Sequence, residues 1–383
     1  MTKIQRALAA ITRKPLDRLP SHINFADRAR VGAVEKDMGI GPGQLDAYLD
    51  NHMDFVYNKF DLPIHHRNNV ELMDRLEREG FCKVDRGKHI VFDSYGMGIV
   101  QFIDGYNPIF GAMHERGREM GVGFMPDRFP PGFLEMDPDE AVAAYTAPDI
   151  DRPGAYDPVR EAVAKSAEKD QLVVAAGYSG VFERAYGIRS FEEFMVDLAA
   201  EPERAMLFMD KIADFKVEDA RRKVAAGVLV GHHGDDLATQ TAPFFSLEMF
   251  RRMFLPNIKR VFSVFKDAGL PVMMHSCGNI VAFIPDLIDA GLDLLEPVQP
   301  CMDLEYLKRE FGKDLSFWGG IDTQELLPFG TPERVREETR RVVRILGRNG
   351  GYIAGPSQEI MNDVPTANII AMLETIKEEE RNM

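Results

Sequence analysis

The sequence is poor in cysteine, and this scarcity excludes one class of protein. Only 3 cysteines occur among 383 residues, namely Cys82, Cys277 and Cys301. Three thiols cannot form the disulfide framework of a small secreted domain, and an odd number without an export signal suits a reducing compartment. We therefore expect a cytoplasmic protein in which any chemistry of the cysteines is metal or thiolate chemistry.

Long apolar segments are also missing. No stretch reaches the length of apolar residues that a membrane-spanning helix needs. The opening residues, MTKIQRALAAITRK, predict a short amphipathic helix that ends before Pro15, and they lack the apolar centre of a signal peptide. We expect neither export nor a membrane partner.

Positive charge is in deficit. The 46 lysines and arginines stand against 61 acidic residues, which gives a net charge of -15. A protein that binds nucleic acid needs a basic face for the phosphate backbone, so this balance argues against a nucleic-acid partner and against an anionic membrane surface. The hydrophobic fraction of 45% is ordinary for a globular protein.

From residue 171 onward, apolar runs of β type alternate with segments of helical period. Such alternation predicts a parallel sheet covered by helices. One helix is expected to begin after Thr331 and to end at Gly347, another covers Asp303–Phe311, and Pro256 predicts a kink. Six strands are expected: Leu172–Tyr178, Val228–Gly231, Pro271–His275, Leu294–Val298, Leu315–Trp318 and Tyr352–Ala354.

The fold that these units favour is an α/β protein with a single (β/α)8 barrel of the TIM type over residues 1–383. An N-terminal helical extension precedes it, and the first 170 residues must supply two more strands, of which Arg18–Asn24 is one candidate. The stretch Lys83–Phe102 predicts a hairpin, and residues 105–153 predict an insertion over the barrel mouth. An open doubly wound sheet is the alternative, although no glycine-rich phosphate motif follows a strand.

In such a barrel, the active site lies at the carboxyl ends of the strands. Polar and titratable residues gather at the ends of the expected strands, as a catalytic site requires. They are Tyr178, the run from His232 to Asp236, His275, Cys277, the run from Glu296 to Gln299, Asp322, and the run from Ser357 to Glu359.

The sharpest local pattern is His275-Ser276-Cys277. In extended backbone, residues two apart project to the same side, so the imidazole and the thiol are expected to face one point. Imidazole nitrogen and thiolate sulfur suit Zn²⁺, and three protein ligands with one open position are typical of a catalytic zinc site. The alternative is a buried cysteine beside a hydrogen-bonded core histidine.

Several segments together resemble the uroporphyrinogen decarboxylase superfamily over about the last two hundred residues. The resemblance implies the barrel fold and two functional branches, one of decarboxylases and one of corrinoid-dependent methyltransferases. The segments are SGVFERAYGIRSFEEFMVDL (179–198), GDDLATQ (234–240), MMHSCGNI (273–280), FWGGIDTQELLPFGTPERVREE (317–338) and GGYIAGPSQEIMNDVPTANI (350–369).

The residues favour the methyltransferase branch. Decarboxylases of this superfamily carry an entry motif like M-R-Q-A-G-R-Y, whereas the corresponding stretch here is NFADRAR (24–30), which keeps only Arg28 and Arg30. The methyltransferases hold zinc with H-x-C and a distant cysteine, and His275 and Cys277 match the first half.

The distant cysteine is absent. Where that branch has A-P-C-H at the end of the last strand, this chain has GPSQ, with Ser357 in place of the cysteine. Serine is a poor zinc ligand, so another residue must supply the third position. We expect Glu296, on the neighbouring strand; the other candidates are Cys301, Glu359, His232 and His233.

Five residues are expected to take part in catalysis without binding the metal. Asp235 and Asp236 follow a strand and point in opposite directions, so at most one faces the site, and we favour Asp235 as the functional carboxylate. Its alternative role is to cap a helix. The other four are Tyr178, Glu183, Gln299 and Asp322.

The expected function is that of the methyltransferase component of a corrinoid-dependent system, which demethylates or methylates a small ether, amine or thioether with zinc. The resemblance places the corrinoid (methylcobalamin) on a separate protein, because this chain has no D-x-H-x-x-G module. One alternative is a decarboxylase that uses Asp27 or Asp235 with Arg28 and Arg30; another is a noncatalytic tetrapyrrole or corrinoid binder. The assembly state stays open, with a homodimer as one option.

Overall fold

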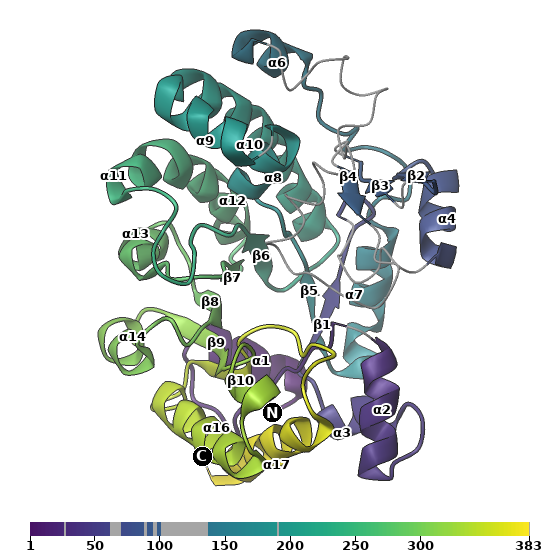
Figure 1. Ribbon diagram of the computed structural model, residues 1–383, viewed down its shortest axis with the longest axis vertical. Helices are drawn as coiled ribbons and strands as arrows, with labels where there is room; N and C mark the ends of the chain where they lie inside the picture. The colour runs from purple at the N-terminus through teal and green to yellow at the C-terminus, as the bar shows by residue number, and fades with distance from the viewer. Residues whose placement is uncertain are drawn as a thin grey trace.

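The computed structural model of the protein describes residues 1–26, 28–61, 70–87, 90–94, 98–100, 137–189 and 191–382. Its centre is built from parallel strands surrounded by helices (Figure 1). The predicted insertion over residues 105–153 lies outside the described residues up to residue 136. Asp27, named above for a decarboxylase, lies outside them too.

Seven parallel strands form two hydrogen-bonded sheets. The larger sheet has the order β10-β9-β8-β7-β6, and β1 pairs with β5 in the smaller one. The strands are β1 (Met53–Val56), β5 (Leu172–Ala175), β6 (Gly231–Gly234), β7 (Val272–His275), β8 (Leu294–Val298), β9 (Ser316–Ile321) and β10 (Tyr352–Pro356).

Two of these strands differ most from the sequence prediction. β6 begins at Gly231, where the predicted strand Val228–Gly231 ended, so the prediction was wrong by about one strand length. Apolar residues alone marked the predicted strand, whereas His232 and His233 continue the extended backbone. β1 was not predicted, because its four residues include Asp54 and show no clear apolar run.

Backbone hydrogen bonds continue the strand order beyond the two sheets. Gly234 donates its N–H to the Gly177 carbonyl just past β5, at 2.7 Å. On the other side, Ala354 of β10 donates to the Pro20 carbonyl at 2.8 Å, and His52 donates to the Ser21 carbonyl at 3.2 Å. The extended residues next to Ser21, inside the predicted strand Arg18–Asn24, therefore lie between β10 and β1.

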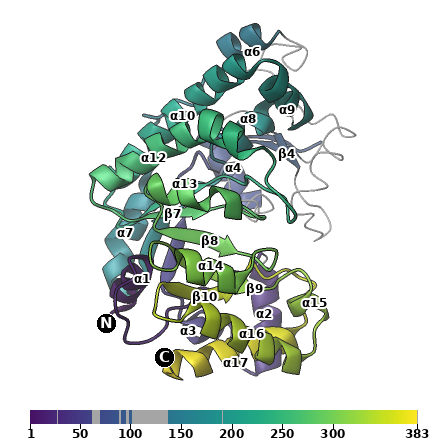
Figure 2. The same cartoon turned by 90° about the vertical axis from the view of Figure 1, so that its left-hand side faces the viewer.

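One side of the sheets encloses a small apolar cluster beneath α1 (Lys3–Ile11). Strand residues that include Met273 and Leu294 pack there against Ala7, Ala10 and Ile11 of that helix. In Figure 2, α1 lies on the left side of the molecule, and β4 (Gly98–Val100) and α15 (Leu326–Phe329) lie on the right side. Two positions further along β7 and β8, the same faces carry polar side chains, His275 and Glu296.

A larger apolar cluster lies between the strands and the outer helices, which include α8, α10, α12, α16 and α17. The helices, besides α1, are α2 (Arg28–Met38), α3 (Gln44–Leu49), α4 (Val70–Arg78), α6 (Pro138–Ala144), α7 (Asp157–Lys169), α8 (Phe182–Arg189), α9 (Phe191–Ala200), α10 (Pro202–Ala225), α11 (Leu247–Met249), α12 (Leu255–Asp267), α13 (Ile284–Asp289), α14 (Leu304–Phe311), α15 (Leu326–Phe329), α16 (Pro332–Leu346) and α17 (Thr366–Asn382).

The predicted helix boundaries are confirmed in this region. The Thr331 hydroxyl accepts the Arg334 N–H at the start of α16, which ends at Gly347. Near Pro256, where a kink was predicted, the helical bonding pattern changes, because a π-helical turn, η2 (Phe250–Phe254), precedes α12. Proline has no N–H to continue the α-helical pattern, so the bonding changes just before it.

A separate three-stranded antiparallel sheet contains the predicted hairpin. It consists of β2 (Lys83–Asp85), β3 (Ile90–Phe92) and β4 (Gly98–Val100), in that order. A short 3-10 helix, η3 (Val281–Phe283), follows β7. In the described part of the chain, no helix has both the length and the apolar character needed to cross a membrane.

Candidate metal centre at the strand ends

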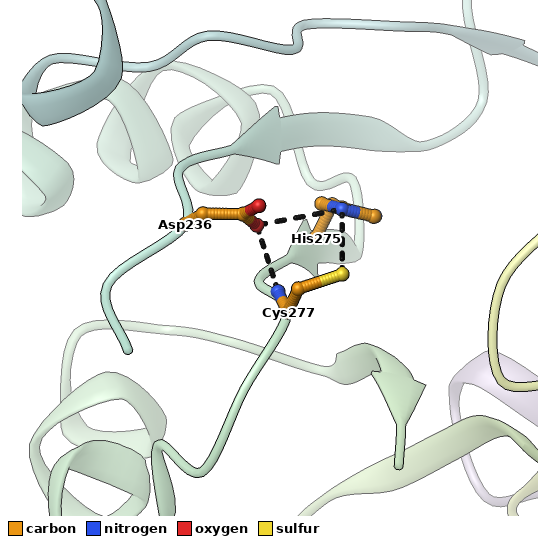
Figure 3. Close-up of side chains that lie close together, drawn as sticks. All are labelled: Asp236, His275 and Cys277. Atoms are coloured by element: carbon orange, nitrogen blue, oxygen red, sulfur yellow. Dashed lines mark hydrogen bonds and ion pairs between the residues drawn. The ribbon is translucent and has the colours of Figure 1, made fainter. Parts of the chain in front are cut away.

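Three potential ligands for a metal converge where β6 and β7 end. Asp236 lies two residues after β6, His275 is the last residue of β7, and Cys277 follows two residues later. One carboxylate oxygen, one ring nitrogen and the sulfur all lie within 4.8 Å of one another. His275 Nε2 is 3.5 Å from Asp236 Oδ1 and 3.7 Å from Cys277 Sγ (Figure 3).

A backbone N–H from the loop after β7 holds Asp236 in this position. The Cys277 N–H donates to Asp236 Oδ1 at 2.7 Å, which ties the loop after β6 to the loop after β7. His275 and Cys277 face the same point, as their spacing of two residues predicts. Oxygen, nitrogen and sulfur ligands of this kind are those that Zn²⁺ accepts.

Glu296 lies on the other side of the His275 ring. Glu296 is on β8 and is the register partner of His275 on β7. The Oε1 atom of Glu296 is 2.9 Å from His275 Nδ1. Its Oε2 is 3.5 Å from His232 Nε2, and His232 Nδ1 accepts the Gly177 N–H at 3.1 Å. Since that acceptor must be unprotonated, the proton of His232 is on Nε2 and points to the carboxylate.

The electrostatics of the cluster favour positive charge. Burial opposes the ionised form of Glu296, yet His275 and His232 hold its pKa down at about 2. Burial also opposes the His275 cation, but its interactions with Glu296 and Cys277 outweigh burial and raise the pKa of His275 well above the ordinary value. The surroundings that retain a proton on His275 favour a metal cation at the same point, so the residues fit a bound zinc ion.

Burial disfavours the thiolate form of Cys277, which is the form that binds a metal. Burial and the Asp236 carboxylate raise its pKa to about 11. A divalent cation next to the sulfur would reverse this effect, because a coordinated thiol gives up its proton.

In the structure, Asp236 and not Asp235 lies beside His275. Asp235, favoured above as the functional carboxylate, accepts the N–H groups of Val181, Phe182 and Glu183 at 2.9, 2.9 and 2.8 Å. It caps the start of α8, the alternative named for it. Asp236 is the carboxylate that faces His275, and it takes the third place in the ligand group that Glu296 was expected to fill.

The missed residue had a signal in the alternation of β6. His232 faces Glu296, whereas the His233 ring packs at 5.9 Å from Phe262 of α12, so even positions face the interior. That alternation places the side chain of Asp236, not that of Asp235, on the interior side. The preceding segment is apolar at every position from Val228 to Val230, so the sequence did not show which side was inward.

Tyr178 and Glu183 lie beside the metal ligands. The Tyr178 ring packs edge-on against His232 and His275, with ring centres 5.0 Å apart in both pairs. Burial and the charges of Asp236 and Asp235 raise the pKa of Glu183 well above its ordinary value. This environment therefore favours the protonated form of Glu183.

Asp322 does not belong to the group of possible metal ligands. Asp322 accepts the N–H groups of Gln324, Glu325 and Leu326, so it caps the start of α15. The Ser357 hydroxyl accepts the Thr323 N–H at 3.3 Å.

Two ligand candidates are outside the group as well. Burial raises the pKa of Glu359 to about 7, and Cys301 is a half-buried thiol. Neither belongs to the ligand group that contains His275. Gln299, by contrast, contacts the Cys277 sulfur directly at 3.4 Å.

A match to a known family identifies the class of protein to which this chain belongs. The sequence pattern of the family "Uroporphyrinogen decarboxylase (URO-D)" matches residues 117–379, which is more than half of the chain. The chain belongs to this family, and the predicted resemblance is confirmed.

Among curated proteins, it is 28% identical over 178 residues to the methylated-thiol--coenzyme M methyltransferase of Methanosarcina mazei, a match that covers 46% of each chain. It is 25% identical over 186 residues to the uroporphyrinogen decarboxylase of Chlorobium luteolum, which covers 47% of this chain and 50% of that protein. The matches thus span about half the length of these relatives, and both relatives are enzymes.

A solved structure described as a methyltransferase from Methanosarcina mazei has the same fold. Its TM-score is 0.59 at 17% sequence identity, over 99% of both chains. At this identity, the likeness concerns the fold alone.

Proposed function

We propose that this protein transfers a methyl group between a methylated small molecule and a corrinoid, and that Asp236, His275 and Cys277 hold a zinc ion for the reaction. One observation carries the proposal: these three residues bring oxygen, nitrogen and sulfur ligand atoms within 4.8 Å of one another at the strand ends. The methyltransferase relative supports this chemistry within the family.

The zinc, when bound, would act as a Lewis acid that polarises the heteroatom carrying the methyl group, or that favours the thiolate form of a thiol acceptor. In demethylation, the bond between heteroatom and carbon breaks and its electron pair stays on the heteroatom. A cob(I)alamin on a partner protein would supply the nucleophile that accepts the methyl group, and the released heteroatom would take up a proton.

The residues of the chain position these groups. Glu296 holds the His275 ring through Nδ1, and His232 holds Glu296 in turn. Such outer partners fix the orientation of a metal ligand. The ring of Tyr178 packs against both histidines and covers them from water. The raised pKa of Glu183 favours its protonated form, which would be a proton source beside the ligand group.

The substrates that we propose are small methyl ethers, methylamines or thioethers. A porphyrinogen would bring eight carboxylates into a protein of net charge -15, and it would need a dense cluster of arginines. Arg30, one of two arginines at the expected place, donates to the Val364 carbonyl and to the Thr366 hydroxyl instead. This use of Arg30 favours methyl transfer over decarboxylation.

We also propose that the strands close into one eight-stranded barrel and that residues 1–383 form a single domain in the cytoplasm. The backbone hydrogen bonds from Gly234 to Gly177 and from Ala354 to Pro20 support a closed order, in which the residues next to Ser21 provide the eighth strand. In that arrangement, the metal ligands lie at the carboxyl ends of the strands, where barrel enzymes carry their active sites.

Two measurements test the proposed function. Protein purified without chelator is analysed for metal, and one zinc per chain is expected. The protein is then mixed with cob(I)alamin and a panel of methyl ethers, amines and thioethers, and the methylcobalamin spectrum is followed. Coproporphyrinogen formed from uroporphyrinogen, with no methylcobalamin from any compound, would overturn the proposal. Silence in both assays would leave a noncatalytic binder of tetrapyrrole or corrinoid.

A further inference from the structure

The sulfur of Cys277 receives two side-chain amides from distant parts of the chain. Gln299, directly after β8, places its Nε2 3.4 Å from Cys277 Sγ. Gln358, two residues after β10, places its Nε2 at the same distance of 3.4 Å. Both contacts are within the range for a hydrogen bond to sulfur.

The orientation of the Gln299 amide is fixed by its own partners. Its Oε1 accepts the Gly278 N–H at 2.8 Å and the Gln240 Nε2–H at 2.8 Å. Because only the oxygen can accept two donors, the NH₂ group must face the other way. Its two hydrogens are directed at Cys277 Sγ and at the Ser357 carbonyl, which is 3.3 Å away.

Gln358 is oriented in the same manner. Its Oε1 accepts the Glu359 N–H at 3.0 Å, so its NH₂ group faces the sulfur. Cys277 Sγ is therefore an acceptor for two N–H groups, while His275 and Asp236 lie close to it on their side of the ligand group. An acceptor of this kind suits the thiolate that a bound zinc ion would favour at this position.

From this arrangement we infer that Gln299 and Gln358 shield the Cys277 thiolate from being methylated by the substrates of its own active site. N–H groups that bond to a thiolate draw electron density from the sulfur and weaken it as a nucleophile. A methyl-transfer site needs this protection, because an unprotected thiolate would displace the leaving group and keep the methyl group as a thioether. The inference rests on the proposed function and assigns both glutamines as positioning residues.

The test compares methionine variants, because methionine has nearly the shape of glutamine but no N–H. Gln299→Met, Gln358→Met and the double variant are loaded with zinc and treated with methyl iodide. The Cys277 thiolate displaces iodide and becomes S-methylcysteine, which is quantified by mass spectrometry of the peptide that contains it. Gln324→Met, at an exposed position after β9, is the matched control.

Cys277 is expected to be methylated faster by about 5-fold in each single variant and by about 10-fold or more in the double variant, since 5-fold in rate corresponds to about 1 kcal/mol, which is within the range for one hydrogen bond. Gln324→Met should behave like the wild type, and Cys301 serves as the internal reference. Unchanged methylation rates at unchanged zinc content would overturn the inference. So would loss of zinc from Gln358→Met while the wild type keeps it, because the amide would then be needed to hold the metal.

The outcome is separate from that of the proposed function. If the wild type binds zinc but forms no methylcobalamin, the proposed methyl transfer fails, and the methylation rates of the zinc-loaded variants still report whether the two amides protect the sulfur. If Gln299→Met does not fold, Gln358→Met decides the test by itself. Gln358 is partly exposed, and its side-chain amide contacts Cys277 Sγ and the Glu359 N–H, so this substitution should be tolerated by the fold.

Discussion

The Nδ1 atom of His275 and the Oε1 atom of Glu296 lie 2.9 Å apart on the neighbouring strands β7 and β8. This contact turns the Nε2 atom of the same ring toward Asp236 and Cys277. A residue on one strand thus sets the direction in which a residue on the next strand offers its lone pair. The carboxylate contributes to the site by orienting His275 from behind.

The first prediction concerns the ligands themselves. Cys277→Ser and Asp236→Asn are each expected to weaken zinc binding more than the roughly 10–100-fold that is typical of losing an outer partner, because each removes a donor atom. Zinc affinity is measured by competition with a chromophoric chelator. Cys301→Ser is the matched control and should bind zinc like the wild type. Full zinc binding by Cys277→Ser would contradict the proposal that Cys277 is a zinc ligand.

The second prediction separates the two possible roles of Glu296. If it orients His275, Glu296→Gln keeps an acceptor for the Nδ1–H and should retain most of the zinc affinity. Glu296→Leu loses the acceptor and should weaken binding by about 10–100-fold. Equal and severe loss in both variants would show that Glu296 is a direct ligand, as the sequence alone suggested.

The third prediction concerns stability. Asp235→Ala leaves three N–H groups at the start of α8 without their acceptor, and it should lower the free energy of unfolding by about 2 kcal/mol. Urea unfolding followed by circular dichroism measures the change. Asp322→Ala, which uncaps the short helix α15, should cost less because Asp322 is more exposed. A stable Asp235→Ala protein that has lost zinc would contradict the capping role.

The fourth prediction is a pH dependence that arises from His233. Burial, together with the nearby Lys216 cation, lowers its pKa from 6.5 to about 3. The unfolded chain therefore binds a proton near pH 6.5 that the folded chain refuses until about pH 3. This contribution to stability is complete above the unfolded pKa and is lost as the pH falls between these values, by at most about 1.4 kcal/mol per pH unit.

His233→Phe should accordingly flatten the decline in unfolding free energy between neutral pH and about pH 5. The measurement is urea unfolding of both proteins at several pH values. Phe262→Leu removes the ring that packs against His233 but keeps the titrating group, so its slope should match that of the wild type. A His233→Phe protein with an unchanged slope would assign the acid sensitivity to other groups.

Local features of the fold followed from the sequence because they depend on neighbours along the chain. Thr331 and Gly347 limit α16 through contacts within a few residues, and Pro256 changes the helix just before it. The apolar strands β7 to β10 were visible in the same way. β1 and the start of β6 were not, because polar residues occupy part of each strand.

For the site, the sequence by itself determined that His275 and Cys277 face one point, since their spacing in extended backbone requires it. Only the tertiary structure decided that Asp236 joins them and that Glu296 lies behind the histidine ring. Both depend on which face of a strand is inward, and a shift of one residue exchanges the two faces. Gln358 reaches the same sulfur from the end of β10, a contact between residues far apart in the sequence that only the folded chain brings together.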